Sequence, residues 1–319
     1  MNRTLRVMGG RLFSPALAAA VLVSASAAAA DENLPRFKTT ATNLTLSDGT
    51  RTVLDYHYGE VPFKPYIAQL TTPGGMQILR DSPFDHKHHH GLMFAVAAEG
   101  VNFWEEFPTS GRQVHRGFDG IDVSNRGGTS VASFGEQLDW IAPKQGALLR
   151  EARKLTLYRR PGLGATLLTW STRLEPAGDR AEVKLGGSYY FGLGMRFLVS
   201  MDKVGQTSWA DSKDSEVVHG DTRLTHSAWC AYTAPADGKP VTAALLDHPS
   251  NPRHPARMFN MVTPFAYLSA TLNLSKEPLV VTKDRPLAVR YGVALWDGKA
   301  QPAQVEALYR QWLQLEEKP

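Results

Sequence analysis

Short segments with the character of β-strands recur along most of the chain, and this spacing constrains the fold more than any other feature. Each segment mixes apolar and polar residues over a few positions, and most are bounded by Gly, Pro, Asp or Asn. The pattern is typical of an antiparallel sandwich or barrel rather than of alternating strands and helices. The predicted strands span residues 36–46, 52–58, 66–72, 76–80, 91–98, 130–140, 151–159, 165–174, 181–191, 227–233, 241–246, 265–272 and 287–296.

Helical periodicity is convincing only near the C-terminus. After Pro302, five apolar residues fall on one face at helical spacing, and we expect that face to pack against a sheet. The sequence therefore predicts an all-β fold, a large antiparallel β-sandwich with one C-terminal helix. The five residues are Val305, Leu308, Tyr309, Trp312 and Leu315.

The first 30 residues have the pattern of an export signal. Arg3, Arg6 and Arg11 precede an apolar run over residues 12–23, and small residues up to Ala30 suit cleavage after that residue. The run is shorter than the roughly 18–20 apolar residues that span a bilayer, and no later stretch approaches about 18 apolar residues. We predict a signal peptide over 1–30, a single β-sandwich domain over 31–319, no membrane span, and a periplasmic or secreted location.

Charge and motif content disfavour several functional classes. The chain has 35 Lys and Arg residues against 31 Asp and Glu residues, and removal of three signal-peptide arginines leaves 32 against 31, a net charge of +1. That balance gives no support to a nucleic-acid partner. The sequence has no P-loop, Rossmann glycine fingerprint, G-x-S-x-G elbow or H-E-x-x-H motif. The one cysteine, Cys230, cannot form an internal disulfide and is expected to be a small buried residue.

Histidines are concentrated in residues 85–91, which hold four of the ten in the chain. Along an extended strand, His86, His88 and His90 would share one face. Imidazoles on one face can bind Zn, Cu, Fe or Ni, and imidazole can also act as a general acid or base near neutral pH. We therefore take His86, His88 and His90 as candidate ligands of a divalent transition metal, and His88 and His90 as candidate catalytic residues. A packed, hydrogen-bonded polar core is the alternative.

Two further segments combine polar and aromatic residues in ways that suit a sugar. Trp104 and Glu105 are neighbours, and His115 follows shortly afterwards. Aromatic faces can stack on the C–H faces of a pyranose while polar side chains bind its hydroxyls. We predict that Trp104 binds substrate, that Glu105 is an acid and that His115 is catalytic. Simple core packing is the alternative for Trp104.

The second segment, 247–255, contains three prolines, which stiffen the loop. We predict that Asp247 and Arg253 bind substrate and that His254 is catalytic. Arg196 and Tyr190 are weaker candidates for substrate binding. A solvated loop is the alternative for this segment.

Several of these motifs together resemble a known family. Residues 85–94, read as Asp-His-Lys-His-His-His-Gly-Leu-Met-Phe, resemble the D-H-x-H-H-x-G-L-x-F signature of the PmoA-like family of exported bacterial proteins. The name "methane oxygenase" given to that family does not suit this chain, because the methane monooxygenase subunit spans the membrane several times. One departure is Trp296, where relatives often have His. Further matches lie at 100–104, 111–115, 247–255, 290–293 and 296–298.

The resemblance implies an exported protein from carbohydrate-degrading bacteria, with a sandwich fold similar to the supersandwich of aldose mutarotases. Together with the residues above, it predicts a carbohydrate-active enzyme of the hydrolase, lyase or epimerase type, acting on a small-molecule or oligosaccharide substrate. Two alternatives stay open: a metal-dependent oxidative enzyme and a non-catalytic glycan-binding module.

Overall fold

The computed structural model describes residue 1 and residues 34–210 and 214–316. The described residues from Leu34 onward belong to one compact unit. Apart from Met1, the predicted signal peptide falls outside the described residues. Among the residues that are described, no helix is both long and apolar enough to cross a membrane.

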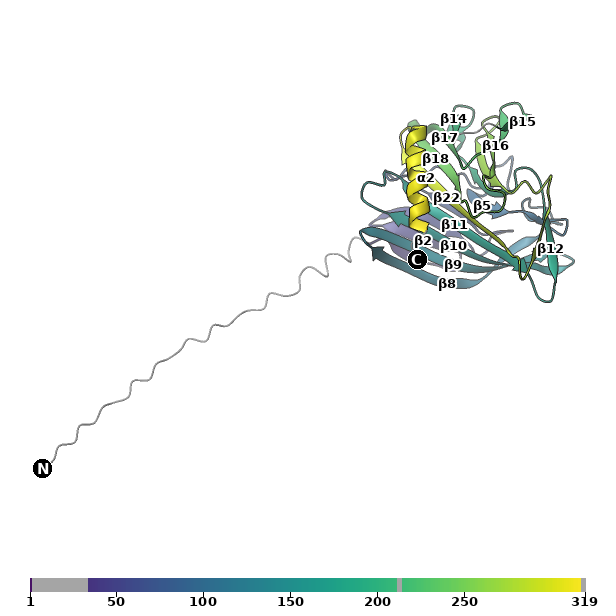
Figure 1. Ribbon diagram of the computed structural model, residues 1–319, viewed down its shortest axis with the longest axis horizontal. Coiled ribbons are helices and arrows are strands. Elements are labelled where there is room, and N and C mark those ends of the chain that lie inside the picture. The colour runs from purple at the N-terminus through teal and green to yellow at the C-terminus, as the bar shows by residue number, and fades with distance from the viewer. Residues whose placement is uncertain (2–33, 211–213, 317–319) are drawn as a thin grey trace. The chain divides into compact units, whose positions relative to one another are not determined.

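Two large sheets and one small sheet make up the fold, and every strand pair in them is antiparallel (Figure 1). The ten-stranded sheet has the order β1 (Arg36–Thr39), β2 (Asn43–Asp48), β3 (Arg51–His57), β4 (Tyr66–Leu70), β5 (Leu92–Ala95), β13 (Gly192–Arg196), β20 (Tyr267–Thr271), β19 (Arg257–Met261), β16 (Thr222–His226) and β15 (Ser215–His219).

The eight-stranded sheet contains the longest strands. Its order is β14 (Gln206–Trp209), β17 (Trp229–Ala236), β18 (Lys239–Asp247), β22 (Leu287–Asp297), β11 (Thr166–Pro176), β10 (Gly146–Arg159), β9 (Thr129–Ala142) and β8 (Arg112–Arg126). The small sheet has the order β21 (Leu279–Thr282), β12 (Glu182–Gly186), β6 (Ala97–Ala98) and β7 (Val101–Asn102). A short 3₁₀ turn, η1 (Val199–Met201), follows β13.

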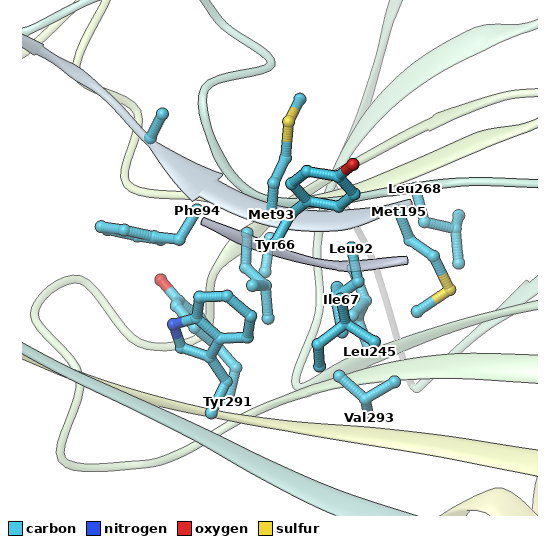
Figure 2. Close-up of a cluster of buried hydrophobic side chains, with 14 of the residues drawn as sticks. Tyr66, Ile67, Leu92, Met93, Phe94, Met195, Leu245, Leu268, Tyr291 and Val293 are labelled. Carbon is cyan, nitrogen blue, oxygen red and sulfur yellow. The ribbon is translucent and has the colours of Figure 1, made fainter. Parts of the chain in front are cut away.

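The main core joins the two large sheets. Ile67 and Leu92 from the ten-stranded sheet lie near Leu245 and Val293 from the eight-stranded sheet (Figure 2), and all four are fully buried. Side chains alternate between the two faces of a strand. The neighbours of Leu245 and Val293 therefore point to the opposite face of the eight-stranded sheet, where they require a second apolar cover.

Helix α2 (Pro302–Glu316) provides that cover (Figure 1). Its apolar stripe packs with Trp229, Leu246, Ala294 and Trp296 in a second buried cluster. Trp312 is fully buried there, and its Nε1 donates a hydrogen bond of 2.8 Å to Thr169 Oγ1. The predicted all-β antiparallel fold and its C-terminal helix are thus confirmed.

The centre of the ten-stranded sheet is buried on both faces. Every residue of β5, β13 and β20 is buried, although a sheet with one solvated face would alternate buried and exposed residues. Gly194 of β13 is needed for this cover, because a Cβ there would lie 1.8 Å from Tyr267 Oη and 2.7 Å from Trp104 Cη2. The candidate site lies among the residues that cover these three strands on the face that points away from the eight-stranded sheet.

Replacing Trp312 with Ala should lower the free energy of unfolding by about 3–5 kcal/mol, because it removes a large buried side chain and leaves a cavity between helix and sheet. Urea denaturation would measure the change. Gln311→Ala, at an exposed position of the same helix, is the matched control. A loss below about 1 kcal/mol for Trp312→Ala would contradict the packing role of the helix.

Candidate functional site

The histidine segment forms a looped structure rather than a strand; we call residues 81–91 the histidine loop. The backbone N–H of His86 donates to Pro83 O at 3.0 Å, and that of His89 donates to His86 O at 2.9 Å, so two turns follow one another. Asp81 and His90 then close the loop as an isolated bridge. The prediction that His86, His88 and His90 share one face is wrong, because turns replace the two-residue alternation of a strand.

His90 is held on both sides by carboxylates. Its Nδ1 lies 2.7 Å from Asp81 Oδ1, and its Nε2 lies 2.7 Å from Glu106 Oε1. Lys64, which is fully buried, donates to the same Glu106 oxygen at 2.6 Å. Burial opposes the charged form of His90, but the hydrogen bonds to Asp81 and Glu106 outweigh it and raise the pKa of this imidazole. Both ring nitrogens are therefore occupied by protein groups, and His90 fixes the end of the loop.

This arrangement does not form the predicted metal set of His86, His88 and His90. Within residues 34–210 and 214–316, no three His, Cys, Asp or Glu side chains are grouped so that they could hold a metal ion. His90 cannot join His86 and His88 as a ligand because Asp81 and Glu106 already bind both of its ring nitrogens. For the same reason, His90 is better described as a positioning residue than as the predicted catalytic residue.

A cavity of about 250 Å³ lies between the histidine loop and a wall of aromatic side chains. His86 and His89 stack with their ring centroids 4.7 Å apart, and His88 packs edge-on against His89 at 4.5 Å. Glu105 supplies the carboxylate of the cavity. The rest of the lining consists of Tyr189, Tyr190, Phe259, Met261, Phe265 and Tyr267.

Two histidines of this cavity are uncharged near neutral pH. Burial, followed by the neighbouring charges of Lys64 and His86, lowers the pKa of His88 to about 4. Burial and the adjacent His88 and His86 lower the pKa of His89 still further. A neutral imidazole offers one hydrogen-bond donor and one acceptor, so these rings are suited to bind uncharged hydroxyl groups.

Buried polar atoms around the cavity lack hydrogen-bond partners within the described part of the chain. They include Nδ1 of His89, Oη of Tyr267 and Nε1 of Trp104. An unpaired buried polar group costs about 1–3 kcal/mol, so such atoms in a folded protein require an explanation. The rings of His89 and Tyr267 line the cavity, whereas these particular polar atoms are shut off from solvent, so a ligand would reach them only after the side chains shift.

Glu105 is held in a fixed orientation. Its Oε2 accepts a hydrogen bond of 3.1 Å from Asn102 Nδ2, and its Oε1 accepts one of 3.3 Å from Tyr190 Oη. Asn102 Oδ1 in turn accepts from the backbone N–H groups of Trp104 and Glu105. Burial and the nearby Glu105 raise the pKa of Tyr190 to about 12, which keeps the phenol protonated as a donor.

Trp104 and Arg196 support the aromatic wall from behind. Trp104 is fully buried and stacks on Phe191 with a centroid distance of 5.1 Å, so core packing describes it better than the predicted contact with substrate. Arg196 is 1 % exposed, and its guanidinium lies 3.6 Å from the ring centroid of Phe265. Neither residue lines the cavity, but Trp104 also packs edge-on against Tyr190 at 5.7 Å, and both Tyr190 and Phe265 do line it.

His115 lies in a separate polar cluster inside the sandwich. Its Nδ1 is 2.6 Å from Oε1 of the fully buried Glu136. Glu136 also accepts a hydrogen bond from Tyr56, which accepts one of 2.8 Å from the fully buried Arg153. The predicted catalytic role for His115 at the histidine loop is therefore not supported, because long-range strand pairing places it on β8 with partners of its own.

Polar groups of the proline-rich loop 247–255 are hydrogen-bonded to other groups of the protein. His254 Nδ1 lies 2.7 Å from Asp247 Oδ2, and Asp247 also accepts hydrogen bonds from Asn251 and Ala256. Arg253 donates to the backbone oxygens of Leu272 and Glu277 at 2.6 and 2.7 Å. None of Asp247, Arg253 and His254 lines the cavity, so these three predicted residues lie outside the site beside the histidine loop.

The structure thus brings five of the predicted residues together at one site, and it places further residues there that were not predicted. His86, His88, Glu105 and Tyr190 line the cavity, and His90 anchors its loop. His89 and Tyr267 were missed as site residues. His89 belongs to the histidine cluster, but the direction of its side chain depends on the turns. Tyr267 lies on β20, where both faces of the strand are buried, so its sequence shows no alternation of apolar and polar residues.

The lowered pKa of His89 predicts a pH dependence of stability. Unfolded histidine takes up a proton near pH 6.5, whereas folded His89, only 6 % exposed, stays neutral. The unfolded state therefore binds more protons as pH falls below 6.5. Wild-type stability should fall relative to that of His89→Phe by up to about 1.4 kcal/mol per pH unit between roughly pH 6 and 5.

Urea unfolding at a series of pH values measures this difference. His219→Asn, at an exposed position of β15, is the matched control and should keep the wild-type slope. Parallel slopes for wild type and His89→Phe would contradict the neutral, buried state of His89.

Comparison with known proteins gives a family but no described activity. A structural similarity exists to a GH36 alpha-galactosidase from Geobacillus stearothermophilus, solved in complex with 1-deoxygalactonojirimycin, at 9 % sequence identity and a TM-score of 0.47. The similarity covers 87 % of this chain and 42 % of the galactosidase chain, so the protein spans less than half the length of that enzyme. No curated protein matches. The sequence profile of the family described as "Family of unknown function (DUF6807)" matches residues 43–310, and the chain belongs to that family.

Proposed function

We propose that the protein is a carbohydrate-active enzyme and that the cavity beside the histidine loop binds one sugar ring. The observation that carries this proposal is the lining of the cavity, where neutral imidazoles, tyrosines, one carboxylate and flat aromatic faces meet around about 250 Å³. This volume lies just below the range of about 300–1,000 Å³ that is usual for small-molecule sites, and it suits a ligand of one ring.

The chemistry of the lining favours a neutral, hydroxyl-rich ligand. Tyr190, Phe259 and Phe265 offer aromatic surface to C–H groups, while the His88 imidazole and the Glu105 carboxyl group offer polar atoms to hydroxyls. The lining residues found in the described chain include no Lys or Arg. A ligand carrying a carboxylate or phosphate would lack a cationic partner in the cavity, and a sugar does not need one.

The same lining favours proton transfer at the sugar. Glu105 and His88 form an acid–base pair. In this pair the carboxyl group of Glu105, in its protonated form, delivers a proton to the sugar, and the neutral imidazole of His88 accepts one from it. Glycoside hydrolysis usually requires two carboxylates flanking the bond, whereas Glu105 is the one carboxylate that lines this cavity in the described residues. An epimerase-type reaction, with one proton delivered to a ring oxygen and one taken from a hydroxyl, therefore fits best.

Glu105→Gln and His88→Asn should each lower kcat/KM by about 10²–10⁴-fold, the usual contribution of a general acid or base. Turnover would be followed by NMR on a panel of freshly dissolved sugars, which detects interconversion of anomers and epimers. Glu175→Gln on β11 and His219→Asn on β15 are matched controls, because both residues lie outside the cavity. They should leave kcat/KM within about twofold of wild type.

His254→Asn separates this proposal from a site in the loop 247–255. It should retain activity as long as circular dichroism shows that the variant folds, because His254 does not line the cavity. Loss of activity in folded His254→Asn together with normal activity in Glu105→Gln would contradict the proposal. Sugar binding without turnover in wild type would instead support a glycan-binding module.

We also propose that the protein works outside the cytoplasm, on the basis of the arginines and the apolar run at its N-terminus. Expression of the full chain in a bacterial host should give a periplasmic or secreted product that begins at Asp31. Mass spectrometry of the intact product would measure its mass and its first residue. A cytoplasmic product that retains residues 1–30 would contradict the proposal.

A further inference from the structure

A larger groove adjoins the cavity and shares two residues with it. The groove has a volume of about 700 Å³, and Glu105 and Tyr190 line both spaces. Because Tyr190 donates a hydrogen bond to Glu105, these two side chains form one unit at the boundary. A ligand in the cavity would therefore have a continuation of the site directly beyond its proposed acid–base residue.

The small four-stranded sheet builds one wall of this groove. Ala97 of β6, Asn102 of β7, and Lys184 and Gly186 of β12 contribute from the sheet, and Pro278 lies just before β21. The lining mixes hydroxyl, amide and ammonium groups with the apolar surfaces of Phe191 and Pro278. A surface of this composition can bind hydroxyls and C–H faces at once, as a chain of sugar units requires.

Size distinguishes the two spaces. The cavity suits one ring, whereas the groove is nearly three times larger and lies well inside the usual range for small-molecule sites. We propose that the groove binds the neighbouring units of an oligosaccharide whose terminal ring occupies the cavity. This inference rests on the proposed function, and it assigns an oligosaccharide rather than a free monosaccharide as the preferred ligand.

Gly186 allows a direct test. A Cβ at this position would meet no atom within 4 Å, and its backbone does not have the positive φ values that disfavour other residues. Gly186→Trp should therefore fold and place an indole in the groove, while the cavity remains unchanged. Gly186→Ala is the matched control, because it has the same backbone requirement and fills little of the groove.

The probes are glucose, galactose, mannose and xylose with their linear oligosaccharides of two to four units, and the binding constants come from isothermal titration calorimetry. We expect wild type and Gly186→Ala to bind the oligosaccharides of one sugar series at least about tenfold more tightly than its monosaccharide. Gly186→Trp should lose this gain, while its Kd for the monosaccharide stays within about twofold of wild type.

The other outcomes separate this inference from the proposed function. Equal wild-type affinity for the monosaccharide and its oligosaccharides would overturn the role of the groove and leave the cavity proposal standing. A gain with chain length that persists in Gly186→Trp would also overturn it. If no sugar of the panel binds to wild type, the proposed function fails, and the inference about the groove fails with it.

Discussion

The burial of β5, β13 and β20 on both faces is the constraint on which the candidate site depends. The inner faces of these strands complete the core with the eight-stranded sheet, and their outer faces require a second cover. Trp104 and Tyr267 supply part of that cover, because both lie against Gly194 of β13. Where the cover is incomplete, the chain leaves a cavity whose walls include Tyr267 of β20. The site thus follows from the way a very wide sheet is shielded from water.

Buried charge then fixes the loop that forms the other wall. Lys64, Glu106 and His90 are joined by short contacts beneath the surface, and His90 also contacts Asp81, which is exposed, so each charged group has an opposite partner. Buried pairs of this kind add little net stability, but they are costly to break because one charge would be left unpaired. The arrangement therefore favours one conformation of the histidine loop, which keeps His88 and His89 neutral and directed to the cavity.

Much of the fold could be predicted from the sequence, because strand alternation and the stripe from Val305 to Leu315 are local signals. The candidate site could be predicted only in part. Glu105 and the histidine cluster were identified, but the turns after Pro83 change which imidazoles lie together. Nothing local indicates that His115 pairs with Glu136, or that Arg253 binds the backbone oxygens of Leu272 and Glu277. These partners are distant in sequence and meet only through the tertiary fold.

The most direct test of the proposed sugar site is a crystal structure of the protein with the tightest-binding sugar. A ring in the cavity, with hydroxyls within hydrogen-bond distance of the His88 imidazole and the Glu105 carboxyl group, is the predicted result. Sugar bound instead at the loop 247–255, with the cavity filled only by water, would contradict the assignment of this site.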